Sequence, residues 1–161
     1  MKKRNFKGFT LIELIVVIAI IGVLAAILVP TMMNWVRKSS INAANSNAKT
    51  IFTNAQTISQ EAETAGTVIT ATIDSGNAGT DQSYTLGGTT KSFIAEVSAA
   101  ATGTNASARW AVQINTGIVE AAIFSSNGTT YMGGYPNPCP TDSARTFNSA
   151  QVGSASQGAS W

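Results

Sequence analysis

Hydrophobic residues are concentrated near the start of the chain. Residues 14–36 contain no charged side chain and begin Leu-Ile-Val-Val-Ile-Ala-Ile-Ile. A helix of these residues would be about 34 Å long at a rise of about 1.5 Å per residue, which is enough to cross the hydrocarbon part of a bilayer. The run therefore predicts a membrane-spanning helix.

The next segment has apolar residues at spacings of three and four, with polar residues between them, as in an amphipathic helix. We expect this helix to continue the first one, so that a single helix runs from near Phe9 to Glu63 and ends at Ala65-Gly66. Its apolar stripe consists of Ile41, Ala44, Ala48, Ile51, Phe52, Ala55, Ile58 and Ala62.

Beyond Gly66 the apolar period changes to two, which indicates strands. Residues 109–115 alternate, Thr116-Gly117 provides a turn, and residues 118–125 form a second strand. The pair Asn127-Gly128 is a hairpin signal and predicts a third strand over residues 129–132. We expect an antiparallel meander whose inner face covers the helix stripe with Trp110, Val112 and Ile114.

The remaining segments have weaker patterns. Residues 92–98 predict either another strand or a short helix, and residues 74–90, rich in Gly, Thr, Ser and Asn, predict a long loop. We expect residues 136–140 to be stiff and extended, and residues 144–161 to be a tail of weak order. The predicted fold class is α+β, with a long N-terminal helix packed against a small antiparallel sheet.

Charge is unevenly distributed along the chain. Four of the ten cations lie in the first seven residues, which favours a cytoplasmic N-terminus with the rest of the chain outside. Without them, six cations face eight carboxylates, a formal net charge of −2. That balance argues against a basic nucleic-acid-binding protein, and we expect no specific nucleic-acid site.

The sequence also restricts the chemistry. Cys139 is the single cysteine and histidine is absent, so an intrachain disulfide is excluded and zinc sites or histidine-dependent catalysis are disfavoured. No phosphate-binding P-loop is present, and acids such as Asp74, Asp81 and Asp142 are scattered. We expect no enzymatic activity, no cofactor and no metal site.

The junction between the basic and apolar parts is distinctive. Residues 7–14 read Lys-Gly-Phe-Thr-Leu-Ile-Glu-Leu, which places an acid at the edge of the apolar run, and Pro30 is the twenty-second residue counted from Phe9. In this combination residues 2–35 resemble the type IV pilin and pseudopilin family. The alternative is an ordinary secretory signal cleaved near Ala25-Ala26.

The resemblance implies specific processing. A prepilin peptidase would cut between Gly8 and Phe9, Phe9 would be N-methylated, and Glu13 would become the buried acid of a filament core. The chain would then divide into a leader (residues 1–8), a transmembrane or filament-core helix (9–36), the amphipathic half of the helix (37–65) and a soluble head with a flexible C-terminal tail (66–161). Many members close their C-terminal region with a disulfide, so how this chain holds that region is open.

Glu13 and Pro30 have physical explanations beside the resemblance. A carboxylate in an apolar span costs roughly 2.5 to 3.5 kcal/mol on insertion scales, and cleavage would create an α-amine at Phe9, one helical turn away, that could offset this cost. That pairing could form within a subunit or between subunits, and the resemblance favours the second; alternatively, Glu13 lies at the headgroup boundary without a specific partner. Pro30 predicts a local kink or loosening, either as a flexible point of the filament core or as the end of the span.

Three functions remain in competition. The first is a pilin, a structural subunit of a type IV pilus-like surface filament for adhesion or motility. Its partners would be copies of itself, the membrane, prepilin peptidase, and the pilus assembly platform with its motor ATPase. The precursor would be a single-pass membrane protein and the assembled form would lie at the cell surface.

The alternatives are a pseudopilin of a type II secretion or competence DNA-uptake system and, from another class, a membrane-anchored monomeric surface-binding protein. Tyr131, Tyr135 and Trp161 could be exposed and bind sugars, or could pack in the head. Cys139 could cross-link subunits or be a buried, idle thiol.

Overall fold

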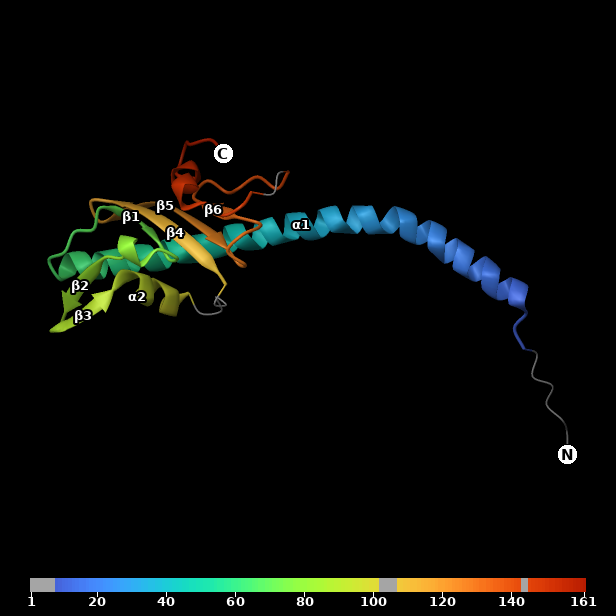
Figure 1. The fold of residues 1–161 in the computed structure, drawn as a ribbon. Helices are drawn as coiled ribbons and strands as arrows, with labels where there is room; N and C mark the ends of the chain where they lie inside the picture. Colours follow the sequence, from blue (N-terminus) through green and yellow to red (C-terminus); the bar gives the residue numbers. More distant parts are fainter. Residues whose placement is uncertain (1–7, 102–106, 143–144) are drawn as a thin grey trace, which may run out of the picture. The chain divides into compact units, whose positions relative to one another are not determined.

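The computed structural model describes residues 8–101, 107–142 and 145–161. The chain divides into two compact units, Met1–Val36 and Arg37–Trp161, and the second carries the sheet (Figure 1). Its fold class is α+β, as the sequence predicts. The residues before Gly8, including the four early cations and most of the expected leader, lie outside the described residues.

The long helix α1 spans Leu11–Thr64 without interruption, within two residues of the predicted bounds. In the second unit one face of α1 is buried, and this face carries the predicted apolar stripe with Phe52 partly buried at its margin. Gly66 follows the helix at a φ of +84°, a conformation that glycine adopts without steric cost. The period of three and four thus identified both the helix and its buried side.

A four-stranded antiparallel sheet covers this stripe in the order β1-β4-β5-β6. The strands are β1 (Ala71–Asp74), β4 (Arg109–Asn115), β5 (Ile118–Ser125) and β6 (Gly133–Tyr135). Trp110, Val112 and Ile114 are buried with the helix stripe in one core, as predicted. The Thr116-Gly117 turn is also confirmed, with both residues at positive φ.

The predicted third strand over residues 129–132 is wrong. The strand that pairs with β5 is β6, which places Gly133 opposite Phe124 and Gly134 opposite Ile123. Asn127 explains the difference, because its Oδ1 accepts hydrogen bonds from the backbone N–H groups of Thr129 and Thr130 at 3.2 and 2.9 Å. The side chain thereby organises a wider loop in place of a two-residue hairpin turn.

The predicted long loop over residues 74–90 is also wrong, because it contains ordered elements. A 3-10 helix, η1 (Ala78–Thr80), precedes a hairpin of β2 (Ser83–Leu86) and β3 (Thr89–Ser92). Gly87 and Gly88, at φ of 60° and 84°, form the turn of this hairpin. A Gly-Gly pair between two alternating segments is a hairpin signal, which the sequence-based prediction overlooked.

The undecided segment near residue 92 is helical. Helix α2 (Phe93–Ala100) begins after Ser92, whose side chain accepts a hydrogen bond from Ala95 N–H. Asp81 supports the same helix start, since its Oδ1 accepts from Ile94 N–H at 2.9 Å. These side chains satisfy helix N–H groups that would otherwise lack partners.

The C-terminal segment contains an element where the sequence suggested weak order. A 3-10 helix, η2 (Ser149–Ala155), buries Val152 and Ala155 in a second cluster with Ala111, Ala121, Ile123 and Met132. Figure 1 shows this segment on the face of the sheet opposite α1. Because the sheet is covered on both faces, β5 reads as a nearly continuous apolar run.

Candidate processing and assembly site

The beginning of α1 is built by a reciprocal pair of side chains. Thr10 donates from its backbone N–H and its hydroxyl to Glu13 Oε2, at 2.8 and 2.7 Å, and Glu13 N–H donates to Thr10 Oγ1 at 3.4 Å. This arrangement is a capping box. Thr10 is the N-cap residue of α1, and the Glu13 carboxylate accepts a hydrogen bond from the Thr10 N–H, which has no partner within the helix. Sequence reasoning missed the role of Thr10, although a Thr-x-x-Glu pattern before an apolar run is its known signal.

Gly8 and Phe9 precede this cap in an exposed, non-helical stretch. A Cβ atom added at Gly8 would meet nothing within 4 Å, so packing in this structure does not require glycine there. Phe9 is 89% exposed and lines a shallow hollow together with Ile12, Glu13 and Val16. Gly8 and Phe9 are therefore exposed, and Phe9 and Glu13 lie on one side of the helix start.

Pro30 lies within the helix and is not part of this cluster. It is separated from Glu13 by seventeen residues, or about 26 Å of helix. The helix passes through Pro30 without a break, and the neighbouring Thr31 hydroxyl donates to the Leu28 carbonyl at 2.8 Å. The structure thus keeps Pro30 in regular helix, and its two proposed roles stay predictions.

The side chains of residues 8–36, the described part of the first unit, are exposed. By length and composition, α1 is the helix among the described residues that can cross a membrane. The most apolar stretch of α1 has no buried residue. A continuous apolar surface of this size is rare on soluble monomers and marks a membrane or protein contact. The exposed large hydrophobic residues include Leu11, Leu14, Ile18, Ile21, Leu24, Ile27, Leu28, Met33 and Trp35.

Two of the three aromatic residues considered for sugar binding pack in the head. The rings of Tyr135 and Phe52 meet edge to face with centroids 5.0 Å apart, and Lys49 Nζ lies 5.8 Å from the Tyr135 centroid. Trp161 lies against Gly134 and donates from Nε1 to the Asn137 carbonyl at 3.2 Å. The packing interpretation is therefore the better one for Tyr135 and Trp161.

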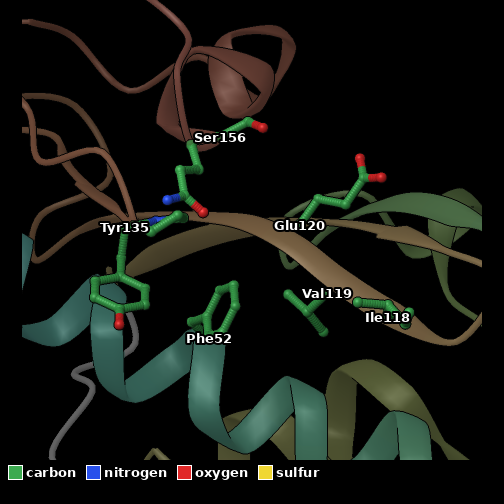
Figure 2. A pocket seen from close by; sticks show the side chains of 8 residues that line it. Phe52, Ile118, Val119, Glu120, Tyr135 and Ser156 are labelled. Carbon is green, nitrogen blue, oxygen red and sulfur yellow. The ribbon is translucent and has the colours of Figure 1, made fainter.

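A groove of about 380 Å³ lies beside these rings, between α1, β5 and the C-terminal segment (Figure 2). Figure 2 shows Phe52 and Val119 on the α1 side of β5, whereas Glu120 points away from the rings. Both Glu120 oxygens already accept hydrogen bonds, from the amides of Gln113 and Asn115. The polar and apolar groups of the groove do not converge on one point, as those of a ligand site do.

Metal and thiol chemistry receive no support from the described part of the chain. It contains no cluster of three or more His, Cys, Asp or Glu residues able to hold a metal ion. Cys139 is 2% exposed, and this burial raises the pKa of its thiol. A buried and protonated thiol fits the idle role better than the cross-linking role.

Comparison with known proteins finds a family match at the N-terminus and several similar proteins. Residues 3–29 match the family described as the prokaryotic N-terminal methylation motif. The type IV major pilin protein PilA of Myxococcus xanthus is 48% identical over 50 residues, 31% of this chain and 22% of that protein. A fimbrial protein of Pseudomonas aeruginosa is 35% identical over 88 residues, 55% of this chain and 57% of that protein.

The type II secretion system core protein G of Pseudomonas aeruginosa is 41% identical over 51 residues, 32% of this chain and 36% of that protein. No solved structure gives a significant match. The chain spans less than two thirds of the length of each of these relatives. Their names describe filament and secretion subunits and no enzyme, in agreement with the expectation of a non-enzymatic protein.

The matched residues that the structure describes, 8–29, form the helix start and most of the exposed apolar half of α1. They include Gly8, Phe9 and Glu13, and the match ends just before Pro30. Motif, helix and an antiparallel sheet on its amphipathic half occur together in one α+β chain. By this motif, these relatives and this fold, the chain is similar to the type IV pilins and pseudopilins.

Proposed function

We propose that this chain is a pilin, a structural subunit of a type IV pilus-like surface filament that serves adhesion or motility. The precursor is held in the membrane by the first half of α1, with its N-terminus in the cytoplasm. Prepilin peptidase cuts between Gly8 and Phe9, Phe9 is N-methylated, and an assembly platform with a motor ATPase adds the subunit to the filament.

The observation that carries this proposal is the uncovered apolar half of α1. Burying apolar surface stabilises by about 25 cal/mol per Å². Because no residue in the most apolar stretch of α1 is buried, this stretch is stabilised by any apolar surroundings that cover it. The bilayer provides these surroundings before assembly, and the same helices of neighbouring copies provide them in a filament. A monomeric anchored protein needs the bilayer around this helix, but it does not need the motif at residues 3–29.

Glu13 is proposed to direct the assembly. In the uncut chain its carboxylate accepts the two hydrogen bonds from Thr10. Cleavage adds a positive α-amine at Phe9, and a carboxylate has lone pairs for both partners. We propose that Glu13 keeps the cap of its own helix while it pairs with the Phe9 amine of a neighbouring subunit.

A pseudopilin is the second candidate function, favoured by the similarity to the type II secretion system core protein G. It would use the same processing and a shorter assembly. The two candidates differ in where the mature chain is found and not in its N-terminus.

The test is the intact mass, with N-terminal fragmentation, of protein sheared mechanically from intact cells. Recovery in sheared polymer of chains that start at N-methylated Phe9 supports the pilin. Chains that start at Phe9 but stay with the membrane support the pseudopilin. Uncut chains that start at Met1 would overturn both.

A further inference from the structure

The Asn127-Gly128 pair is a sequence signal that the fold does not use as a two-residue hairpin turn. It is the single Asn-Gly pair in the chain, and Asn127 is exposed. Asparagine is a thermolabile residue, and it is lost when the backbone nitrogen of the next residue attacks its side-chain amide. Glycine has no side chain to shield that nitrogen, so Asn127 is the asparagine of this chain whose neighbour hinders the attack least.

This reaction needs water and no other reagent. The Gly128 nitrogen forms a bond to Asn127 Cγ and gives up its proton, and Nδ2 leaves with this proton as ammonia. Water then opens the resulting cyclic imide, a succinimide, at either of its carbonyl carbons. Opening at one carbonyl gives aspartate, whereas opening at the other gives isoaspartate, in which the main chain runs through the side-chain carbon.

In this structure the Asn127 amide is fixed at both of its polar atoms. Oδ1 accepts hydrogen bonds from the backbone N–H groups of Thr129 and Thr130 at 3.2 and 2.9 Å, and Nδ2 donates to Thr130 Oγ1 at 2.6 Å. Formation of the new bond draws Cγ to the Gly128 nitrogen and makes it tetrahedral. Because Oδ1 and Nδ2 have to move with Cγ, the hydrogen bonds that hold them oppose the attack.

The backbone around this amide is held as well. The buried Ser125 hydroxyl donates to the Thr130 carbonyl at 2.8 Å. A Cβ atom added at Gly128 would lie 2.7 Å from the Ser107 carbonyl oxygen and 2.8 Å from Arg109 Cγ. Gly128 therefore lies close against the segment that leads into β4, and the attack requires the loop to open.

We propose that Asn127 is a modification site, converted to aspartate and isoaspartate through Gly128, and that the loop of residues 126–130 keeps this conversion slow while it is closed. Conversion takes place in the molecules whose loop is open, so its rate follows the population of this open form. The extent of conversion in a chain thus records how often this part of the head has opened.

The two products have different effects on the head. Aspartate keeps an oxygen that accepts from Thr129 and Thr130, and it adds one negative charge. Isoaspartate adds a carbon atom to the main chain, so the spacing on which both hydrogen bonds depend is lost. Since the Thr129 carbonyl also accepts a hydrogen bond from Phe147 N–H at 3.2 Å, isoaspartate loosens the C-terminal segment too.

The test follows conversion of the full chain at mildly alkaline pH, folded in detergent or unfolded in guanidinium chloride. Trypsin releases Asn127 in the peptide of residues 110–145. Fragmentation of this peptide measures the mass gain at Asn127, and a protein isoaspartate methyltransferase quantifies the isoaspartate. We expect conversion of the folded chain to be at least about tenfold slower than that of the unfolded chain.

Variants at Thr130, which is exposed, test the hydrogen bond to Nδ2. Thr130→Val removes this acceptor and should raise the rate in the folded chain about fivefold. Thr130→Ser is the matched control, because it keeps the hydroxyl and should keep the wild-type rate; circular dichroism verifies that both variants are folded. Equal rates for the two variants, equal or faster conversion in the folded wild type, or no conversion in the unfolded chain would overturn the proposal.

Discussion

The side-chain amide of Asn45 holds the backbone of Cys139 from both sides. Its Nδ2 donates to the Cys139 carbonyl at 3.1 Å, and its Oδ1 accepts from the Cys139 N–H at 2.9 Å and from the Gly134 N–H at 2.9 Å. Asn45 belongs to α1, so this one residue fastens β6 and the following segment to the helix. In a chain with a single cysteine, this attachment is made by hydrogen bonds and not by a disulfide.

A second asparagine continues this attachment. Asn137 donates from Nδ2 to the carbonyls of Ser154 and Ala159, at 2.9 and 2.8 Å, and from its backbone N–H to Ala155 at 2.8 Å. Trp161 donates to the Asn137 carbonyl. Hydrogen bonds therefore hold the C-terminal segment against the stretch that follows β6.

Replacement of Asn45 by Ala should loosen this attachment. Two buried backbone N–H groups would lose their acceptor, which predicts a loss of about 3 kcal/mol in the free energy of unfolding. Urea unfolding of the full chain in detergent, followed by tryptophan fluorescence, would measure it. Asn47→Ala is the matched control, because Asn47 is exposed on the same helix and should change stability by less than about 0.5 kcal/mol.

Cys139 provides a probe of the same region. Since burial raises the pKa of its thiol, the reactive thiolate is scarce at neutral pH and the rate of alkylation by iodoacetamide should be low in the folded chain. We expect Asn45→Ala to raise this rate by roughly tenfold, because it exposes the thiol more often. Equal rates in wild type and in urea-unfolded protein would contradict the buried position.

Gly133 is required by a close approach of two backbones. A Cβ atom there would collide with the α1 backbone at Ala44 and Asn45, so Gly133→Ala should destabilise the head by about 3 kcal/mol or prevent β6 from docking. Gly153→Ala is the control, since its Cβ would meet Gln113 Oε1 at an ordinary 3.5 Å. Thermal unfolding of both variants, followed by circular dichroism, compares them.

Tyr84 should make the head sensitive to alkaline pH. Burial, assisted by the hydrogen bond to Glu61, raises the pKa of Tyr84 to about 12 from its usual 10.0. The folded state holds this proton more tightly than the unfolded state, so the contribution is complete below pH 10 and is lost as pH rises towards 12. The free energy of unfolding of Tyr84→Phe should fall less steeply with pH over this range than that of the wild type. An identical slope in the two proteins would exclude Tyr84 as the cause.

Glu13→Gln tests the proposed pairing in assembly. Glutamine keeps a hydrogen-bond acceptor for Thr10 but removes the charge that would pair with the Phe9 amine. We expect leader cleavage to continue while the yield of sheared filament falls by about a hundredfold, measured by immunoblot of sheared and membrane fractions. A normal filament yield would favour the alternative in which Glu13 lies at the headgroup boundary without a specific partner.

Local sequence determined the N-terminal half of this protein. The charge-free run and the helical spacing from Ile41 to Ala62 identify one helix and its buried face, since both patterns depend on neighbouring residues alone. The motif around Gly8, Phe9 and Glu13 is likewise contiguous. The alternation in β4 and β5 identified the central strands for the same reason.

The tertiary structure decided the C-terminal half. Asn45 and Cys139 are 94 residues apart in the sequence. No local sequence pattern identifies an asparagine in a polar stretch as the acceptor for two distant N–H groups. The position of β6 and the burial of Val152 and Ala155 depend equally on which surface lies opposite them. Hydrogen bonds and packing between distant segments have no period along the chain, so they emerge only when the helix and the sheet have brought those segments together.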